Sequence, residues 1–248
     1  MMVKFPISLP TAFKPRLKMC FLVATPKSSR ESGHDVLPLN SLGMMKIPGD
    51  VQVDAVVEYD NKRGLSEVYN QALDNYAASS EYDAVCLVHD DVEILDCSIC
   101  DKISSAIESG MDLIGVAGGK GWQIPRGYDP KKMPIGWTTA SRDAGMAGMV
   151  VHVGDDGRRF ASSYGPCPAR TLTVDGCFMA LTNNGLSLRF DPQFTFNHYD
   201  MDISFQAWKR EMKTAVYPIL CTHMSQGKGL LKPEYLDSQQ LFLKKWFI

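Results

Sequence analysis

The chain has 248 residues, and its 26 Lys and Arg against 28 Asp and Glu give a formal net charge of −2. Proteins that bind nucleic acid need a positive stripe for the phosphates, so the lack of a dense basic run excludes nucleic acid as the main partner. No apolar stretch approaches the roughly 18 residues of a membrane span, which excludes a transmembrane segment.

The beginning of the chain and the cysteines indicate where the protein is found. Residues 1–16 contain three prolines and no continuous apolar core, which is not typical of a signal peptide. The seven cysteines are an odd number and several lie in apolar runs, which predicts buried, reduced thiols in a soluble cytoplasmic protein. Cys97 and Cys100 form a C-x-x-C, but no second pair stands at zinc-ligand spacing, so we disfavour a metal or redox role for them.

Strands and helices alternate along the first half of the chain. Residues 17–24 are a compact apolar run that stops at Thr25-Pro26, which predicts a buried strand. A loop with a weak helix is expected next, over 27–50. Further strands are expected at 53–59, 84–88 and 113–117, and helices at 65–78 and 99–107. This alternation predicts an α/β fold with a mixed, mostly parallel sheet flanked by helices.

The second half has a different character. Residues 118–148 are rich in Gly, Pro and Trp and show little periodicity. Residues 149–160 predict a hairpin around an Asp-Gly turn. A return to the sheet is expected at 171–181, a helix at 202–212 and a strand at 215–220. We expect one domain over 1–248, with a nucleotide-binding half (17–117) and an acceptor half (118–248).

Two acidic clusters and one late histidine point to chemistry. His89-Asp90-Asp91 directly follows the apolar strand, and Asp200-Met201-Asp202 and His223 come much later. A carboxylate at the mouth of a buried strand is costly unless it is paired, solvated or bound to a metal, and oxygen ligands suit Mg²⁺ or Mn²⁺. A distant carboxylate could act as a base beside such a metal. The pattern predicts metal-assisted transfer from a phosphorylated donor, although a polar trio at a strand end could equally cap the next element.

Five segments, in this order, resemble GT-A glycosyltransferases, in particular those similar to family 2. Residues 87–92 resemble the D-x-D region, 61–73 the N-x-x-G-L-x-x-x-Y-N-x-A-L helix start, and 174–180 the glycine-bearing acceptor strand. Residues 190–203 resemble the F-D-x-x-F … E-D-x-D-L segment, and His223 the C-terminal metal-binding histidine. The resemblance runs from about Leu17 to Gly229. It implies a GT-A fold, Rossmann-like, for the whole chain.

Two positions depart from the usual motifs. His89 stands at the first acidic position of D-x-D, and Tyr199 replaces the Glu of the Glu-Asp pair. We interpret both as features of a subset spelled H-D-D-V and Y-D-x-D. The resemblance then implies Asp91 and His223 as ligands of Mn²⁺ or Mg²⁺, and Asp200 as the catalytic base. It implies these donor-binding residues: Thr25, Pro26, Glu58, Asp60, Asn61, Leu65, Asn70, His89, Asp90 and Lys228.

The acceptor side carries weaker candidates, each with a structural alternative. Trp122 and Trp137 could stack on sugar faces, but tryptophan is more often half-buried core. Asp202 could bind acceptor hydroxyls, although we favour a cap of a helix that begins near Ile203. His198 could orient the base or be a satisfied core histidine, and Lys228 could close over a diphosphate or simply be solvated. Asp175 and Gly176 complete the expected acceptor site.

We therefore expect a metal-dependent, inverting transferase that moves a sugar from a nucleotide-diphospho-sugar, by default a UDP-sugar, to a hydroxyl of a glycan or glycoconjugate. Two alternatives remain open. One is another divalent-metal enzyme, a nucleotidyltransferase or phosphohydrolase, which could also use Asp91. The other is a non-catalytic domain that binds sugar nucleotides, which the departures at His89 and Tyr199 would support.

Overall fold

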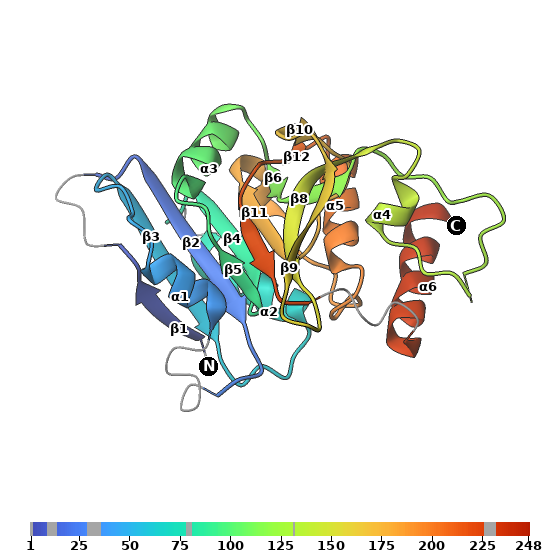
Figure 1. Cartoon of the computed structure of the whole chain (residues 1–248), viewed down its shortest axis with the longest axis horizontal. Coiled ribbons are helices and arrows are strands. Elements are labelled where there is room, and N and C mark those ends of the chain that lie inside the picture. The colour runs from blue at the N-terminus through green and yellow to red at the C-terminus, as the bar shows by residue number, and fades with distance from the viewer. Residues whose placement is uncertain (1, 9–13, 29–35, 78–80, 131, 226–231) are drawn as a thin grey trace.

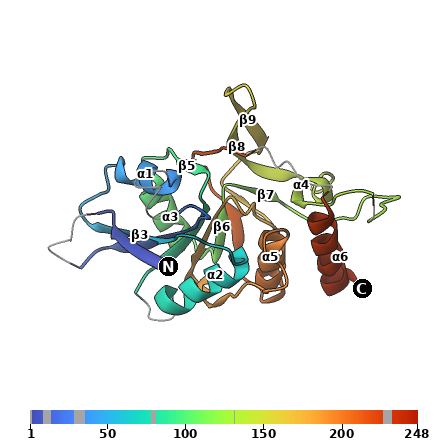
Figure 2. The ribbon, with the colours of Figure 1, turned by 90° about the horizontal axis from the view of Figure 1, so that it is seen from below.

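The structure is a computed structural model of the chain, and it describes residues 2–8, 14–28, 36–77, 81–130, 132–225 and 232–248. Figure 1 shows a twisted central sheet with helices packed around it and α6 at the side farthest from the N-terminus. In the view from below, α1 and α3 lie on one side of this sheet and α2 and α5 on the other (Figure 2). This is the flanked α/β sheet that the sequence predicts.

The larger sheet has eight strands within the described residues, in the order β1-β3-β2-β4-β11-β6-β12-β10. Strand β2 pairs in parallel with β3 and β4, and β6 pairs in parallel with β12. Because β11 is antiparallel to both β4 and β6, all five of these strands run in one direction. Their bounds are β1 Met2–Pro6, β2 Leu17–Ala24, β3 Val51–Glu58, β4 Ala84–His89, β6 Leu113–Gly115, β10 Ala169–Arg170, β11 Phe178–Thr182 and β12 Thr214–Val216.

A smaller sheet crosses the carboxyl end of β4. Its order is β5-β13-β8-β7, and β9 pairs with β8 as a projecting hairpin at the top of Figure 2. Its bounds are β5 Val92–Ile94, β7 Ala117–Gly119, β8 Met146–Val153, β9 Arg159–Gly165 and β13 Cys221–His223. The hairpin is confirmed. The single strand expected over 113–117 is wrong, because the chain passes from the large sheet to the small one at Val116.

The helices differ from expectation mainly at their ends. Helix α2 (Leu65–Ala72) continues as a π-helical turn over Leu73–Ala77, and α3 (Ile99–Glu108) lies where it was predicted. The short α1 (Leu37–Gly43) and α4 (Trp137–Ala140) lie in stretches without clear periodicity. Helix α5 spans Tyr199–Lys209, so the expected start near Ile203 is wrong. Helix α6 (Pro233–Phe247) was not predicted, apart from a small apolar end.

The hydrophobic core holds these strands and helices together. Strands β2 and β4 are buried along almost their whole length, as central parallel strands of an α/β sheet usually are. One hydrophobic cluster joins them to β11, α5 and Phe242 of α6. All seven cysteines are free thiols. Within the described residues, none of the helices has both the length and the apolar character needed to cross a membrane.

Candidate active site

The polar trio after β4 lies where the two sheets meet. His89 is the last residue of β4, and Asp90 and Asp91 form the turn into β5. Strand β13 pairs with β5 so that His223 lies opposite Val92, and the backbone N–H of Met224 donates to the carbonyl of Asp91 at 2.9 Å. As a result the Nε2 atom of His223 is 3.3 Å from Oδ1 of Asp91. The two expected metal ligands, far apart in sequence, are therefore neighbours.

His89 completes a three-residue cluster with them. One ligand atom from each of His89, Asp91 and His223 lies within 4.8 Å of the other two. Burial favours a higher pKa for Asp91, but the hydrogen bond and charge of His223 outweigh it and lower the pKa. Conversely, burial lowers the pKa of His223, but Asp91 raises it overall. Two imidazoles and a carboxylate are a donor set that fits a divalent transition-metal ion, so the residues present fit the expected group.

Asp90 is held by the end of the first strand of the core. The hydroxyl of Thr25, which is fully buried, donates to Oδ2 of Asp90 at 2.7 Å. Thr25 itself is fixed because its backbone N–H donates to the carbonyl of Glu58. The buried hydroxyl of Thr25 therefore orients the carboxylate of Asp90. The neighbouring Pro26 lines the same cavity as Asp90.

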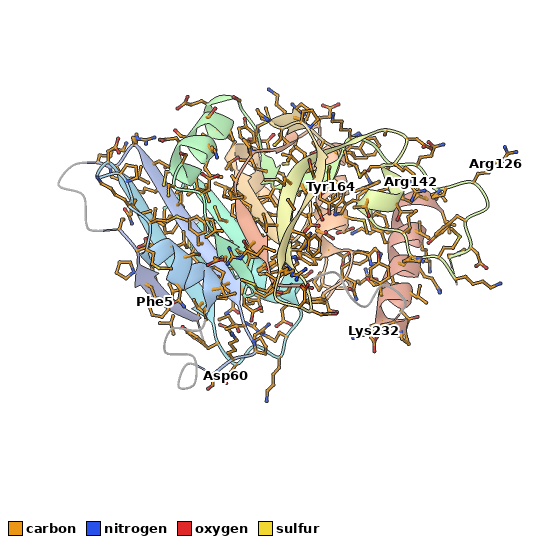
Figure 3. All side chains as sticks on the ribbon, viewed as in Figure 1. Phe5, Asp60, Arg126, Arg142, Tyr164 and Lys232 are labelled. Carbon is orange, nitrogen blue, oxygen red and sulfur yellow. The ribbon has the colours of Figure 1, made fainter. Side chains whose placement is uncertain are left out.

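The first cavity has a volume of about 750 Å³ and opens beside the cluster. Among the expected donor-binding residues, Pro26, Asn61, Leu65, His89 and Asp90 line it. Thr25, Glu58, Asp60 and Asn70 are not among its lining residues. Asp60 lies at the lower edge of the molecule in Figure 3. Lys228 falls outside the described residues.

Asn70 has a structural position instead of a place at the cavity. Its side-chain amide donates to the carbonyl of Phe190 at 2.8 Å and accepts from the N–H of the same residue at 2.7 Å. Both polar atoms of the amide are therefore used to hold the loop before α5 against α2. Glu58 accepts a hydrogen bond from Arg63 at 3.1 Å, which ties the end of β3 to the turn before α2.

A second cavity of about 400 Å³ adjoins the first. Asp200, Asp175, Gly176, Trp137 and His198, all expected catalytic or acceptor residues, line it. Five residues line both cavities: His89, Phe196, Asn197, His223 and Tyr235. The cluster that fits a metal therefore stands at the junction of two cavities.

Asp200 lies in the first turn of α5 and faces this second cavity. Its Oδ2 accepts the backbone N–H of Gly176 at 3.1 Å. Burial, helped by the negative charge of Asp175, raises the pKa of Asp200 to about 7. A carboxyl group with this pKa can exchange a proton near neutral pH, as a general base must.

Asp175 has the opposite character. Its Oδ1 accepts the N–H of Cys177 at 2.9 Å and its Oδ2 accepts Nε1–H of Trp137 at 3.0 Å. Burial alone would raise the pKa of Asp175, but hydrogen bonds from Cys177, the charge of His223 and the hydrogen bond from Trp137 together outweigh it and lower the pKa. Trp137 is thus a buried wall residue that orients a carboxylate, and its ring packs against Tyr164 of β9, labelled in Figure 3.

Three acceptor candidates prove to connect α5 with its neighbours. His198 precedes α5 in a left-handed conformation (φ 63°), and its Nδ1 is 3.1 Å from the hydroxyl of Ser238 on α6. Trp122 packs its ring on Phe205 and Phe242, with centroids 5.4 and 5.3 Å away. Trp122 is not among the lining residues of either cavity.

Asp202 also faces α6. It is completely buried, and its carboxylate accepts from Lys245, Trp246 and Gln206, each at 2.8 Å. It lines neither cavity, and its position within α5 rules out the expected helix cap.

Nothing in the sequence singles out His152 or Phe196. His152 on β8 lies opposite His223 on β13, with ring centroids 5.9 Å apart, and lines the second cavity. Phe196 lines both cavities with 62% of its surface exposed. Only the pairing of β8 with β13, which joins distant segments, could have pointed to His152.

No family model and no curated protein matches the chain. Among solved structures, GalNAc-T7 in a crystal structure with UDP, GalNAc and Mn²⁺ matches with a TM-score of 0.53 at 10% identity, over 90% of this chain and 48% of that one. S. aureus TarS matches with a TM-score of 0.50 at 14% identity, over 92% of this chain and 39% of that one. The chain thus spans less than half the length of either protein, and at this identity the likeness shows the fold alone: the protein has a GT-A-like, Rossmann-like mixed α/β fold.

Proposed function

We propose that this protein is a divalent-metal-dependent glycosyltransferase that moves a sugar from a nucleotide-diphospho-sugar to a hydroxyl of a glycan or glycoconjugate, with inversion. One observation carries the proposal. The cluster His89, Asp91 and His223 stands between a larger cavity and a smaller one, and the smaller one contains a carboxyl group of Asp200 with a pKa of about 7. In such a reaction the nucleotide donor would occupy the larger cavity and the acceptor the smaller one. The ion between them would bind the leaving group.

Each residue then has a defined task. A divalent ion bound by His89, Asp91 and His223 would supply positive charge for the departing diphosphate. Asp90, oriented by Thr25, lines the larger cavity, where the nucleotide would bind. Asp200 takes the proton of the attacking hydroxyl in the second cavity. Because Asp200 would act as a single base in the second cavity, we infer a single displacement and therefore inversion.

The choice of ion rests on the chemistry of the site, and the choice of donor rests on an analogy. Two of the three ligands are imidazoles, which suit Mn²⁺ better than Mg²⁺, since Mg²⁺ prefers oxygen ligands. We choose a UDP-sugar as the donor by analogy with the structure of GalNAc-T7, which holds UDP. We assign the nucleotide to residues 17–117 and the acceptor to residues 118–248 of one domain. The free thiols favour the reducing cytoplasm.

A panel of sugar nucleotides, each incubated with the protein and Mn²⁺, tests the proposal. A transferase releases a nucleoside diphosphate from one donor, faster with an acceptor present. Release of pyrophosphate from a nucleoside triphosphate would instead identify a nucleotidyltransferase. Tight binding of a sugar nucleotide without turnover, unaffected by Asp200→Asn, would identify a non-catalytic binding domain.

A further inference from the structure

The two residues that depart from the usual motifs contact each other. Nε2 of His89 lies 2.6 Å from the hydroxyl of Tyr199, and this hydroxyl in turn donates to the carbonyl of Gly176 at 3.0 Å. Tyr199 begins α5 and is only 3% exposed. The contact joins the end of β4 to the start of α5, beneath the cluster that fits a metal.

Only one arrangement of hydrogens makes both of these contacts hydrogen bonds. The carbonyl of Gly176 can only accept, and a tyrosine hydroxyl has a single proton. When that proton points to Gly176, the oxygen of Tyr199 faces His89 as an acceptor. Nε2 of His89 must then carry a hydrogen, and a neutral imidazole protonated at Nε2 keeps its lone pair on Nδ1.

The surroundings keep the hydroxyl of Tyr199 in place. Its ring packs against the rings of Tyr69 and Phe190, with centroids 6.0 and 5.9 Å away. A Cβ atom at position 176 would overlap the hydroxyl of Tyr199, so only glycine permits this approach. The phenol therefore cannot turn away from His89 without disturbing the core.

We propose that Tyr199 is a positioning residue that holds His89 in the tautomer protonated at Nε2, so that Nδ1 is the atom available to a divalent cation beside Asp91 and His223. The part that concerns the cation rests on the proposed function, whereas the tautomer does not. Metal-binding histidines commonly donate their other N–H to a partner that fixes the ring, and loss of such a partner typically weakens metal affinity about 10–100-fold.

The structure offers a matched control. The hydroxyl of Tyr69 is also buried, and it has no hydrogen-bond partner among the described residues. Tyr69→Phe and Tyr199→Phe therefore remove the same atom from two neighbouring rings, but only the second removes a bond to His89. Both variants lose a buried hydroxyl, but only Tyr199→Phe changes the hydrogen bonds of His89 and of the Gly176 carbonyl.

Two measurements test the inference. In ¹⁵N-histidine NMR spectra of the metal-free wild-type protein, we expect His89 to be protonated at Nε2, and this requires no variant to fold. In Mn²⁺ titrations followed by electron paramagnetic resonance, we expect Tyr199→Phe to bind about 10–100-fold more weakly than wild type, and Tyr69→Phe to match wild type. Circular dichroism confirms that each variant is folded.

The outcomes separate the two ideas. A His89 protonated at Nδ1 in the wild-type protein, or an unchanged Mn²⁺ affinity of folded Tyr199→Phe, overturns the inference. A wild-type protein that binds no Mn²⁺ overturns the proposed function and the metal part of the inference together. A wild-type protein that binds Mn²⁺ but transfers no sugar overturns the proposed function only.

Discussion

The charge of Asp175 adds to the burial that raises the pKa of Asp200 to about 7. Asp175 itself stays ionised because Trp137 and the backbone of Cys177 donate to it. The two carboxyl groups of this small cavity thus have pKa values shifted in opposite directions: hydrogen-bond donors help to lower that of Asp175, whereas burial and the charge of Asp175 raise that of Asp200. This is the arrangement expected where one group is a fixed negative charge and the other exchanges a proton.

Asp200→Asn should abolish transfer and leave UDP affinity within a few-fold of wild type. A general base typically contributes about 10²–10⁴-fold to the rate, and Asn cannot accept the proton. In the wild-type protein only the ionised form of Asp200 is active, so activity should fall as the pH drops below about 7 and level off above it. Initial rates over a pH series, with UDP affinity from calorimetry, check both points.

Asp175→Asn provides the control for this assignment. It removes the negative charge that helps to raise the pKa of Asp200, so the midpoint of the activity profile should move to lower pH. A midpoint unchanged by Asp175→Asn, or an Asp200→Asn variant with full activity, would show that another group controls the proton.

His223→Asn should weaken Mn²⁺ binding by at least about tenfold, because even the loss of an outer partner of a metal ligand typically costs 10–100-fold. His152→Asn is the matched control. Its ring is 5.9 Å from that of His223, but it is not in the cluster, and its Nδ1 is 3.0 Å from the carbonyl of Ser225. Calorimetric Mn²⁺ titrations of both variants check this. Equal losses in the two would mean that the cluster is assigned incorrectly.

Phe196→Ala should weaken binding of a sugar nucleotide more than binding of UDP. Phe196 lines both cavities, where the transferred sugar would lie, and an aromatic contact contributes about 0.5–1.5 kcal/mol, or about 2–13-fold in affinity. Trp208→Ala is the control, since Trp208 is equally exposed, at 61% against 62%, and lines neither cavity. Competition binding measures both ligands, and an equal loss for UDP would place Phe196 against the nucleotide instead.

The elements of the nucleotide half could be predicted because they depend on local patterns. Strands β2 and β4 are largely apolar, and polar residues (Thr25 after β2, His89 at the end of β4) stand at their carboxyl ends, which face the ligand side of an α/β sheet. Asp91 was singled out for this reason, whereas Asp200 was singled out by the second acidic cluster and by the resemblance. The closeness of Asp91 to His223 depends on the pairing of β5 with β13, and that of Asp200 to Gly176 on a contact between α5 and the segment before β11. The resemblance implied that these residues share one site, which periodicity alone could not predict.

The errors have physical causes. The run over 113–117 is continuously apolar, so nothing in it signals that the chain changes sheets at Val116. The role of Asn70 could not be inferred because its partner, Phe190, is a backbone contact 120 residues away. Asp202 was expected at a helix start because Asp suits a cap, but tertiary contacts with α6 determine its position.

Asp202→Ala should destabilise the protein by about 2–4 kcal/mol, because it removes a fully buried carboxylate that accepts from Lys245, Trp246 and Gln206. Asp191→Ala is the control. Asp191 pairs with the same Lys245 at 2.7 Å but keeps 18% of its side chain exposed, so its loss should cost about 1 kcal/mol or less. Urea unfolding followed by tryptophan fluorescence measures both. If Asp202→Ala instead left stability unchanged and raised the KM for the acceptor, the carboxylate would belong to the acceptor site and the contacts with α6 would be incidental.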